Sequence, residues 1–484
     1  MKELHSIGAV EALGRFKDRS LSPVELMEAV IARAEQVEPH INAFASTYFD
    51  EALEGARRAE ARYMGSEPRP RALEGLPVAT KEETPVAGRT LEYGSLAFRG
   101  EVSTYTAPVA ERILAAGGIV HARTTTPEFS CAPFTHSRLW GVTRNPWSAA
   151  HAAGGSSGGS AAALAAGTAA LANGSDIGGS IRIPAAFCGV VGFKPPFGRV
   201  PESPPFNLDH YCHEGPLARS VADCAVFENV IAGPHPHDVA SLRPKLRIPA
   251  RLGPIDGWRI ALSRDLGGYP VDDAVARNLD AAADALRDAG AIVEEVDLGW
   301  DRAAITRAGR AHFAAIFGAW IAEILAQHRD LLTPYAIRFA EDCLAVPEGE
   351  YLAGFELEGE IYAGLGDVLA RHRLLLAPGF SVPALDAGED YVERGPVVNG
   401  VEYDDVYDVL MTLPFNICSR CPVMSMPSGL SPDGVPTAVQ IAGRTFDDVS
   451  VFRAAAALEA RRSIGLPGVD VATPTDPPAP LPSA

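Results

Sequence analysis

The amino-acid sequence predicts an α/β fold: a single large domain in which a mixed, twisted β-sheet is sandwiched by α-helices. Two observations predict it. Short apolar segments typical of buried strands alternate along the 484-residue chain with segments whose apolar residues recur at helical spacing, and this alternation favours parallel strands joined by helices. Near the C-terminus, two further apolar segments flank the turn signal SPDG at residues 431–434, which predicts an antiparallel hairpin.

The N-terminal region is predicted to be helical. Residues 22–25 (SPVE) combine a capping serine, a proline at the first helical position and a glutamate three residues after the serine, which is typical of a helix start. The apolar residues that follow have helical spacing and Pro39 should follow the end of this helix. A second helix is expected at about residues 50–63. Residues 76–81 (LPVATK) then indicate a short buried strand that ends on Lys81.

The elements expected after this strand alternate in type. They are a helix over 108–116, strands over 119–123 and 258–263, a helix over about 272–288, strands over 291–296, 423–428 and 437–442, and a helix from Asp447. No internal linker divides them, so residues 1–465 are expected to form one domain. Residues 466–484 are rich in proline and are predicted to be a flexible tail.

Composition and charge exclude several function classes. Lys and Arg number 42 and Asp and Glu number 61, so the formal net charge is 42 − 61 = −19. That charge argues against nucleic acid as a partner. Seven cysteines are an odd number and too few for a disulfide framework, which favours a reducing compartment. The first residues lack a signal peptide, and the apolar stretch 161–172 is too short to span a bilayer. We therefore expect a cytoplasmic protein with no membrane partner.

Candidate chemistry lies between residues 154 and 196, where two glycine- and serine-rich loops bracket a short alanine-rich helix. Small residues allow the backbone to approach a ligand closely and to point successive N–H groups into one concavity. A serine in such a loop can attack a substrate carbonyl, while neighbouring N–H groups stabilise the oxyanion that forms.

These residues resemble the amidase signature family. The matching motifs are GGSSGGS at 154–160, SDIGGSIRIPAAFCGVVGFKP at 175–195, the lysine motif GLPVATK at 75–81, RTTTPEF at 123–129, and the C-terminal hairpin with Gln440 and Gly443. The resemblance covers about residues 20–462. It implies an amidase with a single amidase signature domain that needs no cofactor and no metal.

Carried over residue by residue, the resemblance implies a triad. Ser180 would be the nucleophile, Ser156 a bridging serine after a cis peptide bond, and Lys81 the base. The spacing between the two serines, 180 − 156 = 24, is that of the family.

Residues around the triad complete the expected site. The backbone N–H groups of Ile177, Gly178, Gly179 and Ser180 would form the oxyanion hole. Three further residues should support the loops structurally: Asp176 and Arg182 as a pair, and Ser157 through hydrogen bonds.

The lysine raises a physical question. A free lysine has a pKa of about 10.4, so a lysine base near neutral pH needs surroundings that disfavour its charge. Lys81 ends an apolar strand, which supplies burial. However, Glu82 and Glu83 follow it, where the family usually has Asp and then Asn or Asp. This acidity would favour the charged lysine unless Glu82 turns away.

The predicted reaction is acyl transfer to Ser180 followed by hydrolysis, with a small-molecule amide as substrate, aryl or aliphatic in its acyl group. The same route accepts carbamates and esters. Six aromatic residues suggest an apolar acyl or aryl pocket: Phe134, Phe206, Tyr211, Phe313, Phe317 and Trp320. Aromatic residues at such spacings are at least as often part of a core. The sequence leaves the oligomeric state open, and the resemblance adds that a homodimer is common in the family.

Several alternatives stay open. The A subunit of a tRNA-dependent amidotransferase uses the same triad with partner subunits, and some relatives are non-catalytic scaffolds. Residues 155–159 also fit G-x-S-x-G, but no apolar strand precedes them. The lone C-x-x-C at 418–421 lacks a second pair for metal binding. Four histidines, His210, His213, His235 and His237, are predicted to be loop residues without a metal.

Overall fold

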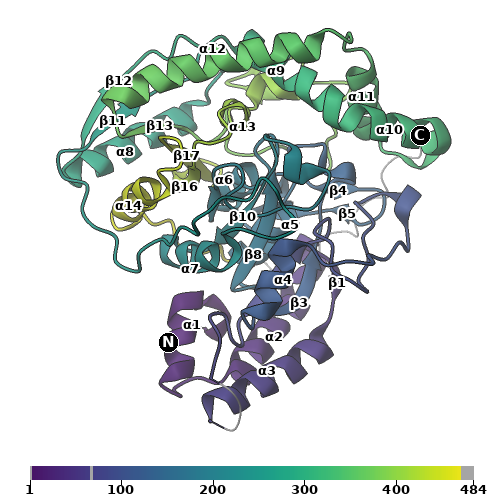
Figure 1. The fold of residues 1–484 in the computed structure, drawn as a ribbon, viewed down its shortest axis with the longest axis vertical. Helices are drawn as coiled ribbons and strands as arrows, with labels where there is room; N and C mark the ends of the chain where they lie inside the picture. The colour runs from purple at the N-terminus through teal and green to yellow at the C-terminus, as the bar shows by residue number, and fades with distance from the viewer. Residues whose placement is uncertain (1–2, 66–68, 470–484) are drawn as a thin grey trace.

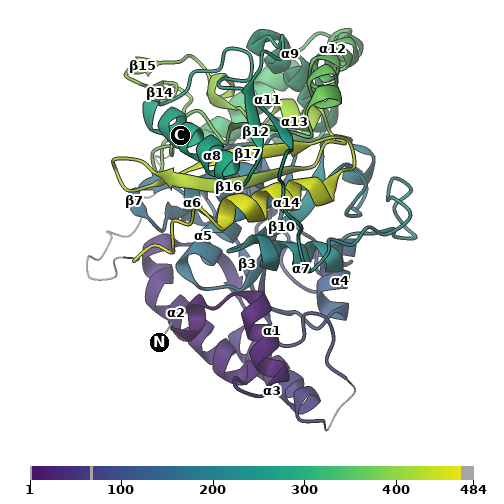
Figure 2. The same cartoon turned by 90° about the vertical axis from the view of Figure 1, so that its left-hand side faces the viewer.

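The computed structural model describes residues 3–65 and 69–469, and its centre is an eleven-stranded mixed sheet (Figures 1 and 2). The strand order is β1-β3-β2-β8-β10-β9-β16-β17-β13-β11-β12. The strands are β1 (Phe44–Thr47), β2 (Pro77–Lys81), β3 (Ile119–Thr124), β8 (Leu171–Asp176), β9 (Val191–Lys194), β10 (His213–Ala218), β11 (Arg259–Leu262), β12 (Ile292–Glu295), β13 (Leu374–Pro378), β16 (Val423–Leu430) and β17 (Pro436–Gly443). The predicted α/β fold with a mixed sheet is confirmed.

The sheet has a parallel segment near each end and an antiparallel middle, and its edge strand β1 pairs antiparallel with β3. β2 pairs in parallel with β3 and β8, and β11 pairs in parallel with β12 and β13. From β8 through β10, β9, β16 and β17 to β13, each neighbouring pair is antiparallel. The predicted turn closes the β16–β17 hairpin, because Ser431 N–H donates to Val435 O at 2.8 Å.

Fourteen α-helices of the described residues surround the sheet. They are α1 (Ala9–Lys17), α2 (Pro23–Ile41), α3 (Phe49–Tyr63), α4 (Pro108–Ala115), α5 (Gly158–Ala166), α6 (Arg182–Cys188), α7 (Val221–Ile231), α8 (Asp273–Asp288), α9 (Arg302–Phe313), α10 (Ala319–His328), α11 (Pro334–Leu344), α12 (Glu350–Arg371), α13 (Pro414–Ile417) and α14 (Asp448–Glu459). Figure 1 shows α1 to α3 at the end of the molecule opposite to α9 to α12. Three short strand pairs lie outside the main sheet: β4 (His136–Ser137) with β5 (Gly141–Val142), β6 (Arg144–Asn145) with β7 (Ser148–Ala152), and β14 (Val397–Val398) with β15 (Val401–Glu402).

Both faces of the sheet are buried, which follows from the alternation of side chains along each strand. On β13, Leu374 and Leu376 join one hydrophobic core, and Leu375 joins another. Helices α7, α8 and α14 cover the first of these faces, while α9, α12 and α13 contribute to the second core. Near β8 the covering helix is the alanine-rich α5, whose residues are all buried.

Some sequence expectations need correction. The capping box at Ser22 is present, but α2 continues to Ile41 with Pro39 inside its last turn. The stretch before Gly155, in which no apolar strand was expected, forms the short and partly exposed β6–β7 pair outside the main sheet. The predicted tail, 466–484, lies outside the described residues except for its first four, which form neither helix nor strand. Within the described ranges, no helix is both long and apolar enough to cross a bilayer.

Candidate active site

Lys81 and Ser156 meet at the end of strand β2. Lys81 is the last residue of β2 and its side chain is fully buried. Its Nζ lies 2.6 Å from Ser156 Oγ. Ser156 belongs to the loop between β7 and α5, and the peptide bond between Gly155 and Ser156 is cis. The structure therefore brings together the lysine and the bridging serine that the sequence singles out.

Ser180 lies on the neighbouring loop, between β8 and α6, and is 7% exposed. The two loops are joined by Ser157, whose backbone N–H donates to Ser180 O at 3.1 Å. The Ser157 hydroxyl also donates to Ser175 O at 3.3 Å. Ser180 and Gly155 both line one cavity of about 60 Å³. The Ser180 side chain is thus accessible beside the loop that carries Ser156.

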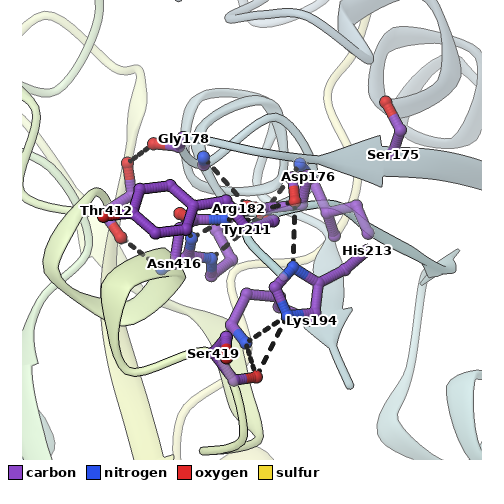
Figure 3. A network of polar contacts seen from close by, with 12 residues as sticks. Ser175, Asp176, Gly178, Arg182, Lys194, Tyr211, His213, Thr412, Asn416 and Ser419 are labelled. Atoms are coloured by element: carbon purple, nitrogen blue, oxygen red, sulfur yellow. Dashed lines mark hydrogen bonds and ion pairs between the residues drawn. The ribbon is translucent and has the colours of Figure 1, made fainter. Parts of the chain in front are cut away.

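The expected pair of Asp176 and Arg182 is present, with both side chains fully buried (Figure 3). Arg182 Nε and Nη2 donate to the two carboxylate oxygens at 3.0 and 2.9 Å. The same oxygens accept the backbone N–H groups of Gly179 and Ile181 at 2.9 and 3.2 Å. Burial by itself would raise the pKa of Asp176, but the charge and hydrogen bonds of Arg182 hold that pKa well below its usual range.

This arrangement bears on the four predicted oxyanion-hole donors. The N–H of Gly179 is already directed at Asp176, so it is engaged in holding the loop. Ile177, Gly178 and Ser180 line the 60 Å³ cavity. The carbonyl of Gly178 accepts a hydrogen bond from Thr412 Oγ1 at 2.6 Å, which fixes the orientation of this peptide (Figure 3).

Residues far along the chain hold Arg182, and the sequence assigned no contact with Arg182 to any of them. Arg182 donates to Gln440 Oε1 and Thr412 O, each at 2.8 Å, and to Asn416 Oδ1 at 2.6 Å. Asn416 in turn donates to Asp176 Oδ1 at 2.8 Å. In the sequence, only Gln440 pointed to this network, because it belongs to the C-terminal hairpin that matches the family.

A second buried cation lies beneath the same loop. Lys194 Nζ donates to Cys421 O at 3.0 Å and lies 3.3 Å from His213 Nε2. Burial lowers the pKa of Lys194 to about 7 and that of His213 to about 3. His213 Nδ1 lies 3.1 Å from Asp176 O (Figure 3). His213 was expected in a loop, but it is the buried first residue of β10.

The two acidic residues after Lys81 take different directions. Glu82 turns away and accepts the backbone N–H groups of Glu92 and Tyr93 at 2.6 and 3.1 Å. Burial raises the pKa of Glu82 to about 7. Glu83 instead faces the lysine, with its Oε1 2.6 Å from Lys81 Nζ.

Comparisons with known proteins show the family of this chain. The family model described as Amidase matches residues 25–452. An acylamidase of Rhodococcus erythropolis is 33% identical, over 95% of this chain and 96% of its own. The chain belongs to the amidase signature family.

Other relatives span more than one activity of this family. The A subunit of the Glutamyl-tRNA(Gln) amidotransferase of Agathobacter rectalis is 30% identical, over 96% of this chain and 95% of its own. The solved structure of a bacterial aryl acylamidase of the amidase signature family is 30% identical, with a TM-score of 0.88 and coverage of 95% of this chain and 96% of that chain. Membership makes the protein an enzyme for amide C–N bonds.

Two cavities adjoin the amidase signature loops. The 60 Å³ cavity beside Ser180 is apolar, and its lining includes Phe313, Phe317, Phe339 and Leu410. A second cavity of about 140 Å³ reaches Ser156. Besides Phe129 and Phe317, it is lined by Tyr93, Tyr105, Phe206 and Trp320, and by the carboxyl groups of Glu83, Glu202 and Glu214.

The expected aromatic pocket is therefore only partly correct. Phe206, Phe313, Phe317 and Trp320 do line a cavity. Phe134 is buried against His136, with ring centroids 4.6 Å apart. Tyr211 is buried and stacks on His312 at 3.6 Å. The sequence could not separate these cases, because core and pocket aromatics have the same local pattern.

None of the remaining candidates lines either of these two cavities. Cys418 and Cys421 are buried free thiols. In the described part of the chain, one group of residues has the spacing of metal ligands: Asp209, His210 and His312. One potential ligand atom from each of them lies within 4.8 Å of the other two. His312 Nε2 lies 2.7 Å from Asp209 and His210 Nε2 lies 3.0 Å from Glu358, so both histidines already have carboxylate partners.

Proposed function

We propose that this protein hydrolyses a small acyl amide through a covalent acyl-enzyme on Ser180. The observation that carries the proposal is the 2.6 Å contact between Lys81 Nζ and Ser156 Oγ, next to a cavity that Ser180 lines. The apolar lining of that cavity favours an aryl or aliphatic acyl group, because burial of apolar surface supplies the binding energy.

The proposed mechanism is a proton relay. Lys81 in its neutral form accepts the Ser156 proton, and Ser156 accepts the Ser180 proton as Ser180 Oγ bonds to the carbonyl carbon. We assign the oxyanion hole to the N–H groups of Ile177, Gly178 and Ser180, since that of Gly179 is directed at Asp176. The proton then returns through Ser156 to the leaving nitrogen, and water releases the acid along the same path.

The test is to label the protein with a fluorophosphonate probe and to map the adduct by mass spectrometry. We expect the adduct on Ser180, its loss in Ser180→Ala, and labelling slowed by about 10²-fold or more in Lys81→Ala. Ser157→Ala removes the neighbouring hydroxyl, which supports the loop through Ser175 O, and its adduct should still lie on Ser180. An adduct on Ser157 in the wild-type protein would refute the mechanism. Hydrolysis of anilides, alkyl amides and carbamates by the labelled and unlabelled protein would then define the substrate.

A second function has support of its own, because a relative 30% identical over nearly the full chain is an amidotransferase A subunit. In that case the protein would release ammonia from an amide for a partner-bound tRNA. The net charge of −19 disfavours contact with tRNA. Ready hydrolysis of acyl amides by the purified single chain supports the first function. Activity on glutamine that requires co-purified partner chains supports the second.

A further inference from the structure

Glu83 occupies an unusual place next to the triad. Lys81 Nζ contacts three groups: Ser156 Oγ at 2.6 Å, Ser175 Oγ at 2.9 Å and Glu83 Oε1 at 2.6 Å. An ammonium has three N–H donors, and these three acceptors use all of them. In this state Lys81 donates to Ser156, so it has no lone pair with which to accept the Ser156 proton.

The lysine therefore needs a group that can take one of its protons. Its side chain is fully buried, which removes bulk water as an immediate acceptor. Within the described ranges, Glu83 is the one ion-pair partner of Lys81. The contact of 2.6 Å between Nζ and Oε1 is that of a charge-assisted hydrogen bond, along which a proton can move.

The carboxylate of Glu83 is itself held in place. Its Oε1 accepts the hydroxyl of Ser175, and its Oε2 accepts that of Ser130. Burial would raise the pKa of Glu83, but the charge of Lys81 and these hydrogen bonds lower it. Ser175 bonds to both Lys81 and Glu83, so it fixes the two members of the pair at one distance.

Other titratable groups face Glu83 across the 140 Å³ cavity. They are Tyr93, Tyr105, Glu202, Cys212 and Glu214, in addition to Lys81. Burial raises the pKa of Glu202 to about 7 and holds the pKa of Glu214 well above its usual range. These two carboxyl groups are thus readily protonated, whereas Glu83 carries the negative charge next to the lysine.

We propose that Glu83 is a positioning residue that holds a proton for Lys81 and so generates the neutral lysine base inside the closed site. This inference rests on the proposed function. Glu83 Oε1 takes one proton from Lys81 Nζ, which turns the ion pair into a neutral pair. Lys81 then accepts the Ser156 proton as Ser156 accepts that of Ser180, and the bond from Ser180 Oγ to the carbonyl carbon forms.

The proton count closes over the whole cycle. When the C–N bond breaks, Ser156 protonates the leaving nitrogen and Lys81 returns a proton to Ser156. Glu83 keeps its proton during this step, so Lys81 is again neutral when water attacks the acyl-enzyme. After Ser180 is released, Glu83 returns the proton to Lys81 and the ion pair forms again.

The test compares Glu83→Gln with the wild-type protein in the rate of fluorophosphonate labelling at Ser180, from about pH 6 to about pH 10. Glutamine keeps the shape but cannot take a proton from lysine. We expect the rate to fall by about 10²-fold at neutral pH, the lower end of the range for a lost proton-transfer partner. The deficit should shrink towards pH 10, because a free lysine loses its proton near its pKa of about 10.4. Glu92→Gln is the matched control, since Glu92 accepts Gly100 N–H and does not line the cavity; its rate should equal that of the wild type.

A second variant covers the case in which Glu83→Gln does not fold. Glu83→Ala opens space for a small carboxylate, because the Glu83 side chain lines the cavity and is 17% exposed. Added formate should restore a substantial part of the labelling rate, which a purely structural role would not allow.

Two results would overturn the inference. If Glu83→Gln is labelled as fast as the wild type, or faster near neutral pH, Glu83 merely stabilises the charged lysine. Formate without effect on a folded Glu83→Ala leads to the same conclusion. Both results leave the proposed function intact, whereas a wild-type protein that is not labelled at Ser180 would refute that function and this role together.

Discussion

The replacement of Asp176 by Asn is the most informative test of how the nucleophile loop is held. Asn keeps the size of the side chain but removes its negative charge. Arg182, which is fully buried, would then lose its ionic partner. The N–H groups of Gly179 and Ile181, which now donate to carboxylate oxygens at 2.9 and 3.2 Å, would keep at most one acceptor between them.

The expected loss of stability is large. Removing one partner of a buried ion pair leaves the other charge uncompensated, which costs about 3–5 kcal/mol. Arg182 keeps three other acceptors, Gln440, Thr412 and Asn416, but all are neutral. We therefore expect the free energy of unfolding of Asp176→Asn to be lower by about 3–5 kcal/mol.

The assay is urea unfolding of both proteins, with Asp280→Asn as the control. Asp280 forms an exposed pair with Arg264 at 2.8 Å, so the same replacement there should cost less than about 1 kcal/mol. The reasoning is refuted if Asp176→Asn costs no more than its control.

The pH dependence gives a second check. Because the pKa of Asp176 is lowered in the folded protein, its contribution to stability is complete above the unfolded pKa of about 3.9. It is lost only as the pH falls through the lower folded pKa. The difference between wild type and Asp176→Asn should therefore be constant near neutral pH and shrink in strong acid.

Two further changes test other parts of the structure. In Gly155→Ala, the added Cβ would lie 2.6 Å from both Ala132 O and Phe134 N, so the loop must move, and we expect labelling of Ser180 to be lost while circular dichroism still reports helix and strand. The second change, Glu228→Gln, replaces a buried carboxyl group by an amide. The two carboxyl oxygens of Glu228 have no hydrogen-bond partner among the described residues. Burial raises the pKa of Glu228 to about 8, so the wild type loses stability as the pH rises from about 4.3 to about 8. In thermal unfolding, the variant should be more stable than the wild type by about 1–3 kcal/mol at pH 8 and by less at pH 5. An equal difference in stability at pH 8 and pH 5 would contradict the raised pKa of Glu228.

Features set by neighbouring residues could be predicted from the sequence. The capping box of Ser22 and Glu25 and the β16–β17 turn depend on contacts within a few residues. The same holds for the two glycine- and serine-rich loops, because small residues allow the required backbone approach whatever surrounds them. Lys81 and Ser156 could be paired only through the family resemblance, since 75 residues separate them.

Other features were decided by the tertiary structure. Whether Glu82 or Glu83 faces Lys81 depends on the chain after β2, where Glu82 binds the backbone of residues 92 and 93. The partners of Arg182 lie more than 200 residues away, at Thr412 and Asn416. Phe317 and Phe134 belong to the same core cluster, yet Phe317 lines the cavity beside Ser180 and Phe134 does not. The sequence by itself determined the family, the fold class and the reactive loops, because local chemistry specifies them. The environment of the lysine and the shape of the pocket required the fold, because burial and charge pairing arise only when distant segments pack together.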